Sequence, residues 1–189
     1  YKVLAKGRTI SIQGRPLIMG IVNITPDSFS DGGRYFSSRA ATAHAINLVA
    51  QGADLLDLGS ESTRPGSAPV GEQEEIDRLL PVLNEVVKQT TVPISVDTMK
   101  SRVARLALDA GASIINDVTA MRFDPDMAAV VAASGAGIVL MHMQGMPATM
   151  QLSPSYDNVV SDVREFLSER IEAAENEGIV KSRIMLDPG

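Results

Sequence analysis

The sequence contains no cysteine among its 189 residues. This absence excludes disulfide bonds, thiol catalysis and cysteine ligands to a metal, and it fits a cytoplasmic protein, which is the location we expect. The sequence also lacks a recognisable signal peptide, and no apolar run reaches the roughly 20 residues that a membrane-spanning helix needs. A membrane is therefore not an expected partner.

Tryptophan is absent too, and aromatic residues make up only 4% of the chain. Alanine, valine, isoleucine and leucine must then fill the interior, which is typical of proteins built on parallel sheets. Positive charge is also scarce, because 17 lysines and arginines face 23 acidic residues and leave a net charge of −6. Such a balance argues against nucleic acid as a partner.

Short apolar segments alternate with longer amphipathic ones along most of the chain. They predict six strands, at residues 17–22, 55–58, 94–96, 113–115, 138–141 and 184–186. A helix is predicted after each of the first five strands, and such alternation indicates a parallel sheet with right-handed crossovers. Pro81 lies within the second helix, so we expect that helix to kink or to restart there. A small β-hairpin is predicted within residues 1–13.

An open doubly wound sheet and a (β/α)₈ barrel both fit this alternation. The first strand-to-helix turn lacks the G-x-G-x-x-G pattern of dinucleotide-binding sheets, which favours the barrel. A complete barrel has eight strands and about 250 residues. The sequence therefore predicts an α/β fold with one TIM-barrel domain over residues 1–189, in which six strands are present and the C-terminal part is missing. The strands at 18–22 and 184–186 are then expected to form open edges.

Nearly every predicted strand ends in a polar residue, and in a barrel the active site lies at these C-terminal strand ends. The residues concerned are Asn23, Asp97, Asn116 with Asp117, His142 and Asp187. Taken singly, each has another explanation. Asp97 or Thr98 could cap the following helix, and the Asn-Asp pair could begin a turn. His142 could be a core histidine, and Asp187 before Pro188 could be only a turn signal. Helix capping explains each acid but not their shared position at strand ends.

These groups indicate the kind of ligand that the strand ends bind. A carboxylate accepts two parallel hydrogen bonds and an amide both donates and accepts, which suits a flat heterocycle with an amino-pyrimidinone edge. Helix N-termini also face this end and favour anions such as phosphate. An Asn and an Asp near a diphosphate would suit Mg²⁺, which takes oxygen ligands. The loops add cations and small donors, namely Arg34, Arg64, Lys100, Thr63, Ser28 and Ser30.

Six motifs, in this order along the whole chain, resemble the dihydropteroate synthase family. They are MGIVNITPDSFSDGG (19–33), ESTRPG (61–66), ISVDT (94–98), IIND (114–117), MHMQG (141–145) and LDPG (186–189). The first two are specific to this family among the pterin-binding barrels. The resemblance implies a folate-synthesis transferase that condenses 6-hydroxymethyl-7,8-dihydropterin diphosphate with 4-aminobenzoate, giving 7,8-dihydropteroate and pyrophosphate. It also implies Mg²⁺ as cofactor, sulfonamides as competitors, and a homodimer.

The resemblance further implies roles for single residues. Asp97, Asn116 and Asp187 would bind the pterin edge, and Met141 would pack under the ring. Asn23 would bind Mg²⁺ together with the diphosphate. Catalytic roles fall to two loop residues, Asp31, which would stabilise cationic character on the pterin, and Arg64. The remaining loop residues would contact the diphosphate or line the aminobenzoate pocket: Thr63, Phe29 and Pro65.

The family's seventh and eighth strands supply a lysine and an Arg-x-His, and these would lie beyond Gly189. We therefore expect the isolated chain to be incomplete for catalysis. Two other functions stay open. One is a methyltetrahydrofolate-corrinoid methyltransferase, which shares the pterin-binding barrel but which the first two motifs argue against. The other is a non-catalytic pterin-binding fragment.

Overall fold

The computed structural model describes the backbone of residues 1–24, 33–61 and 69–189. Six parallel strands form one sheet in which each strand pairs with its neighbour in the sequence. The strands are β3 (Met19–Asn23), β4 (Leu55–Gly59), β5 (Ile94–Asp97), β6 (Ile114–Asp117), β7 (Gly137–Met141) and β8 (Ile184–Asp187). This order confirms the predicted parallel sheet, with β3 and β8 as its open edges.

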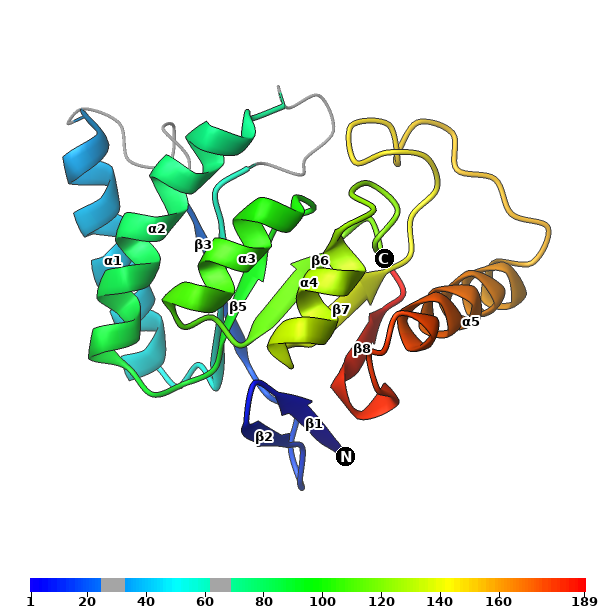
Figure 1. The fold of residues 1–189 in the computed structure, drawn as a ribbon, viewed down its shortest axis with the longest axis horizontal. Coiled ribbons are helices and arrows are strands. Elements are labelled where there is room, and N and C mark those ends of the chain that lie inside the picture. Colours follow the sequence, from blue (N-terminus) through cyan, green and yellow to red (C-terminus); the bar gives the residue numbers. More distant parts are fainter. Residues whose placement is uncertain (25–32, 62–68) are drawn as a thin grey trace.

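A helix follows each of the strands β3 to β7, and the helices lie along one face of the sheet (Figure 1). They are α1 (Gly33–Ala50), α2 (Glu72–Gln89), α3 (Ser101–Ala110), α4 (Met127–Ser134) and α5 (Val159–Asn176), and the 3₁₀ turn η2 (Lys181–Arg183) leads into β8. Within the described residues, no helix is both long and apolar enough to cross a membrane.

The main core lies between the sheet and these helices. Alternate strand residues that face the helices are fully buried, among them Leu56, Leu58, Val96, Ile115, Ile138 and Leu140. Each such side chain stabilises the fold by about 1.5–3 kcal/mol through removal from water. The other set of alternate residues faces the opposite side of the sheet, which is the interior of the predicted barrel.

The helix α2 continues through Pro81 as one element, which excludes the second of the two alternatives expected there, a restart of the helix. Pro81 is exposed, and the buried side of the helix carries Leu79, Val82, Leu83 and Val86. The proline therefore removes one backbone donor on the solvent side, where water can satisfy the freed carbonyl group, and the packed side keeps its helical spacing.

A β-hairpin precedes the sheet, as predicted, with β1 (Lys2–Ala5) antiparallel to β2 (Arg8–Ser11). It lies at the N-terminal end of the strands, away from the chain's C-terminus (Figure 1). Ala5 is fully buried and packs with Leu55 and Ile114 on the interior face of the sheet. The backbone N–H of Lys6 also donates to the carbonyl oxygen of Gly135, at 2.8 Å. The hairpin thus covers the end of the sheet opposite to the polar strand ends.

Candidate functional site

The strand register places the polar strand ends side by side. Asn23 lies opposite Gly59, Gly59 opposite Asp97, and Asp97 opposite Asn116. Asn116 pairs with Val139, and two residues further along the same strand Met141 pairs with Asp187. Because side chains alternate between the two faces of a sheet, all these predicted residues lie on the interior face at the C-terminal edge. The structure therefore brings together Asn23, Asp97, Asn116, Met141 and Asp187.

Asp97 ends β5 and is not a helix cap. The N-cap position of α3 belongs to Lys100, and the backbone N–H of Ser101 donates instead to Oδ2 of Asp124, at 2.8 Å. No hydrogen bond from the described residues compensates the Asp97 carboxylate. Burial raises the pKa of Asp97 well above its ordinary range, and repulsion from four further carboxylates adds to this effect, those of Asp57, Glu75, Asp117 and Glu61. The carboxylate is therefore held ready for an external donor.

Asn116 is oriented by an acid within β4 that is not among the predicted site residues. Its Nδ2 donates to Oδ2 of Asp57, at 3.1 Å, which leaves its amide oxygen as the free acceptor. Asp57 is buried, its Oδ1 has no partner among the described residues, and burial raises its pKa. The sequence does contain a sign of this role, because Asp57 is an acid inside the apolar strand at 55–59. Acidic side chains are rarely buried unless they have a partner.

Asp117 follows Asn116 but has a structural role. It is fully buried, and its Oδ1 accepts hydrogen bonds from the backbone N–H and the hydroxyl of Thr119, at 2.8 and 2.7 Å. Its Oδ2 accepts from the backbone N–H of Met121, at 2.8 Å. These bonds hold a turn in which Ala120 and Met121 have positive φ angles of 52° and 62°. The turn interpretation is thus right for Asp117 and wrong for Asn116.

Asp187 and Met141 lie next to each other at the other end of the site. The Oδ1 of Asp187 accepts from the backbone N–H of Gly189, at 2.9 Å, and its backbone carbonyl accepts from the N–H of His142, also at 2.9 Å. One oxygen of Asp187 thus stays available. The ring of His142 is buried against Phe166 and Tyr156, with centroid distances of 5.0 and 5.8 Å, so the core interpretation of this histidine is confirmed.

The Asn23 side chain is exposed at the end of β3. Its amide oxygen is a hard ligand of the kind that Mg²⁺ accepts. Among the described residues, no group of three or more histidine, cysteine or acidic side chains could hold a metal ion. An amide oxygen of this kind fits a hard cation that takes phosphate oxygens and water as further ligands.

Several predicted residues lie outside the described part of the chain. These are Ser28, Phe29, Ser30, Asp31, Thr63, Arg64 and Pro65. The side chain of Arg34 is likewise not described.

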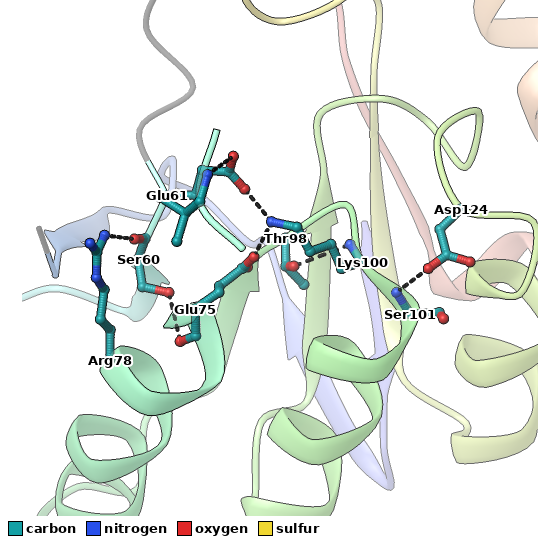
Figure 2. Close-up of polar contacts among 9 residues, drawn as sticks. Ser60, Glu61, Glu75, Arg78, Thr98, Lys100, Ser101 and Asp124 are labelled. Atoms are coloured by element: carbon teal, nitrogen blue, oxygen red, sulfur yellow. Dashed lines mark hydrogen bonds and ion pairs between the residues drawn. The ribbon is translucent and has the colours of Figure 1, made fainter. Parts of the chain in front are cut away.

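Lys100 was expected to offer a positive charge to an anionic ligand, and this expectation is wrong. Its Nζ lies 2.5 Å from Oε2 of Glu61 and 2.5 Å from Oε2 of Glu75 (Figure 2). The pKa of Lys100 is raised, since the two carboxylates outweigh the lowering effect of burial. The ammonium group is neutralised by the carboxylates of Glu61 and Glu75, so it does not offer an unpaired positive charge to a phosphate.

The chemistry of this edge follows from these contacts. It offers the half-buried Asp97 carboxylate, which has no hydrogen-bonding partner among the described residues, the oriented amide of Asn116 and the half-satisfied carboxylate of Asp187, all on one face. Such a set recognises a planar ligand whose edge carries several N–H donors.

Comparisons with known proteins agree with this chemistry. Residues 19–189 match the family model described as pterin binding enzyme. The dihydropteroate synthase of Escherichia coli strain K12 is 43% identical over 188 residues, which are 100% of this chain and 66% of that protein.

Three solved structures share the fold over the whole length of this chain. The dihydropteroate synthase of Xanthomonas albilineans with 4-aminobenzoic acid is 49% identical, with a TM-score of 0.88 and coverage of 100% of this chain and 66% of that one. The same enzyme in complex with 7,8-dihydropteroate is 46% identical, with a TM-score of 0.86 and coverage of 100% of this chain and 66% of that one. The Yersinia pestis enzyme in a sulfonamide drug complex is 43% identical, with a TM-score of 0.91 and coverage of 100% of this chain and 68% of that one. The six strands are therefore part of a TIM barrel, and the chain spans about two thirds of the length of the relatives it matches.

Proposed function

The chain belongs to the pterin-binding enzyme family, and from this premise we propose that it is the larger part of a dihydropteroate synthase. The amine of 4-aminobenzoate attacks the methylene carbon of 6-hydroxymethyl-7,8-dihydropterin diphosphate. A C–N bond forms as the C–O bond to the diphosphate breaks, and pyrophosphate leaves with the bonding electron pair. The amine then loses a proton, and the product is 7,8-dihydropteroate.

The observation that supports this proposal most is the Asp97 carboxylate, which lies beside Asn116 without a hydrogen bond from the described residues. The amino-pyrimidinone edge of a pterin presents parallel N–H donors, which an ionised carboxylate can accept together. Asn116 presents its amide oxygen, because Asp57 accepts from its nitrogen. Asp187 supplies a second carboxylate from the far side, and Met141 packs under the ring.

The ligands of similar structures support the same assignment. The Xanthomonas albilineans dihydropteroate synthase, 49% and 46% identical to this chain in two structures, was solved with 4-aminobenzoic acid and with 7,8-dihydropteroate. The Yersinia pestis enzyme, 43% identical, was solved in a sulfonamide drug complex, so we propose that sulfonamides compete with 4-aminobenzoate here as well.

Roles for the loop residues rest on the motifs that carry them. Thr63 and Arg64 would contact the diphosphate or the aminobenzoate side, and Phe29 and Pro65 would form the walls of the aminobenzoate pocket. Asp31 would stabilise positive charge on the pterin as the diphosphate leaves. Stabilisation of developing charge is often the largest catalytic contribution.

We include Mg²⁺ in the proposal, held by Asn23 and by the diphosphate itself. When bound, the cation would neutralise negative charge on the leaving pyrophosphate. Asn23 would hold the diphosphate end of the substrate at β3, while Asp97 and Asn116 hold the pterin end at β5 and β6. A cytoplasmic location and a homodimer stay predictions.

The test is to incubate the protein with the dihydropterin diphosphate and 4-aminobenzoate and to measure dihydropteroate and pyrophosphate by mass spectrometry. We expect both products from the full-length protein in the presence of Mg²⁺, and little or no turnover from the 189-residue chain. Methyl transfer from methyltetrahydrofolate to a corrinoid, without dihydropteroate, would overturn the proposal. Pterin binding without turnover in the full-length protein would favour the non-catalytic alternative.

A further inference from the structure

An ion cluster of Glu61, Lys100 and Glu75 lies beside the strand ends (Figure 2). The side chains of Lys100, Glu61 and Glu75 are only 11%, 12% and 1% exposed. Two carboxylates share one ammonium group, so the fully ionised cluster has one uncompensated negative charge. The Oε1 of Glu75 is buried and has no hydrogen-bonding partner among the described residues.

The cluster connects three parts of the fold. Glu61 follows β4, Glu75 lies in the first turn of α2, and Lys100 lies in the turn between β5 and α3. Further bonds support each connection. Ser60 Oγ donates to the backbone carbonyl of Glu75, at 3.2 Å, and the backbone N–H of Val70 donates to Oε1 of Glu61, at 3.0 Å. Lys100 therefore fixes the ends of two strands to one helix.

The turn that Lys100 occupies begins directly after Asp97. The backbone N–H of Thr98 donates to the carbonyl of Asn116, at 3.1 Å, and the N–H of Lys100 donates to Thr98 Oγ1, at 3.2 Å. The side chain of Lys100 holds the far end of this turn against Glu61 and Glu75. The turn after Asp97 is thus held at one end by β6, through Thr98, and at the other end by the cluster, through Lys100.

Stability alone does not account for the second glutamate. A buried ion pair is weak evidence for stabilisation, since the cost of removing charges from water can exceed their attraction. One carboxylate would neutralise Lys100, whereas the second adds a buried charge with an unsatisfied oxygen. The charge therefore requires another explanation.

We propose that the Glu61–Lys100–Glu75 cluster is a positioning group for pterin binding, which holds the turn after Asp97 and adds one uncompensated negative charge to its surroundings. This proposal rests on the proposed function, because it assumes that Asp97 binds the pterin. The residues act through Asp97 and touch no substrate themselves.

The charged groups around Asp97 determine the pH at which its carboxyl group ionises. They are Asp57 from β4, Asp117 from β6, Glu75 from α2 and Glu61 after β4. All four carboxylates disfavour ionisation of Asp97. Replacing Glu75 by glutamine removes one of them and leaves Lys100 and Glu61 as a neutral pair. Asp97 should then ionise at lower pH, and pterin binding should persist to lower pH.

Titration calorimetry with 7,8-dihydropteroate across a pH series tests this in the full-length protein. We expect the pH midpoint of binding to fall in Glu75→Gln by about one unit, the order of effect of one nearby like charge. The matched control is Glu74→Gln on the same helix, where Glu74 pairs with Arg78 and is 47% exposed. Its midpoint should equal that of the parent, because Glu74 is not among the charges that act on Asp97. Any titration of the ligand itself is the same in all samples and cancels in the comparison.

Lys100→Met tests the positioning role. It should weaken dihydropteroate binding at neutral pH by about tenfold, the scale of one lost hydrogen bond to a charged group. The control Lys88→Met, which breaks an exposed pair with Glu85, should leave affinity unchanged. If Lys100→Met does not fold by circular dichroism, Glu75→Gln decides, since it keeps one ion pair and the shape of the side chain.

Two results would overturn the proposal. One is an unchanged midpoint in Glu75→Gln, and the other is an equal change in Glu74→Gln. If the parent protein itself does not bind dihydropteroate at any pH, the proposed function fails first. If it binds and only the midpoint stays fixed, the cluster proposal alone fails.

Discussion

Single residues decide which ligand this edge of the sheet can bind. Asp97 is half-buried, is surrounded by like charges and makes no hydrogen bond with the described residues. Such a carboxylate costs free energy in the empty protein, and a ligand with N–H donors removes part of that cost. The residue is therefore better explained by binding than by folding.

Asp97→Asn should weaken pterin binding strongly. The amide can present an N–H group toward the donors of the pterin edge, which leaves buried groups unpaired at a cost of about 1–3 kcal/mol. Calorimetry with 7,8-dihydropteroate measures the change, with the exposed Asp109→Asn as control. Equal affinities of the two variants would show that Asp97 does not contact the pterin.

Asn23→Ala tests the magnesium assignment. No acidic or histidine cluster among the described residues could hold the ion. We therefore expect Mg²⁺ to bind measurably only when the dihydropterin diphosphate is present. The variant should weaken that binding by at least about tenfold, a loss typical even for groups that support metal ligands. Calorimetric Mg²⁺ binding without any diphosphate, or unchanged binding in the variant, contradicts the assignment.

The sequence predicts which residues end the strands, because the end of an apolar run is a local signal. It does not predict partners that depend on register. Asp57 meets Asn116 only because β4 and β6 flank β5, and these residues are 59 positions apart in the chain. For the same reason the sequence predicts Lys100 to be an unpaired cation, whereas in the structure it pairs with Glu61 and Glu75 from other elements.

At the level of elements, the glycine in β3 permits the close approach of α1. A Cβ atom at Gly20 would lie 3.1 Å from side-chain atoms of Leu48 in α1 and of Leu56 in β4. A side chain at this position would therefore force Leu48 or Leu56 to move by a few tenths of an ångström. This contact places β3, and with it Asn23, against β4.

Gly20→Val should destabilise the protein by about 1–3 kcal/mol, the usual cost of overpacking a core. The measurement is the urea midpoint at constant slope. Gly71→Val is the comparison, because a Cβ there meets nothing within 4 Å. It should lose less, about 1 kcal/mol at most, from an unfavourable N-cap residue. A smaller loss at Gly20 than at Gly71 would contradict the packing argument.

Helices and strands follow closely from periodicity here. The strands at 55–59, 94–97 and 137–141 lie within one residue of their predicted bounds. The first helix begins earlier than the predicted residue 38, because glycine and aromatic residues at its start weaken the local signal. The local rule for Pro81 predicts a kink or a second helix, and the second helix is not formed, because burial of the opposite side of α2 keeps it one helix.

For the whole molecule, buried acids govern the dependence of stability on pH. Burial raises the pKa of four carboxyl groups, those of Asp57, Glu75, Asp97 and Asp117. Unfolded aspartate and glutamate have pKa values of about 3.9 and 4.3. Between those values and the raised ones, the folded protein binds more protons than the unfolded chain, so its stability rises as the pH falls.

We therefore expect a higher urea midpoint at pH ~5.5 than at pH ~7.5. At lower pH the trend should reverse. Arg15 lowers the pKa of Asp54 to about 2, and backbone N–H groups lower that of Asp124, so both lose their stabilising charge below the unfolded values. A midpoint that falls steadily from neutral pH to pH ~5.5 would contradict this account. The double variant Asp97→Asn, Glu75→Gln should flatten the rise.

The most direct test of the central claim is a crystal structure of this protein with 7,8-dihydropteroate. We expect the amino-pyrimidinone edge of the pterin to lie within hydrogen-bonding distance of the Asp97 carboxylate and the Asn116 amide oxygen. Asp187 should lie at the other side of the ring and Met141 beneath it. A pterin ring bound elsewhere, or one that leaves Asp97 without a hydrogen bond, would contradict the claim.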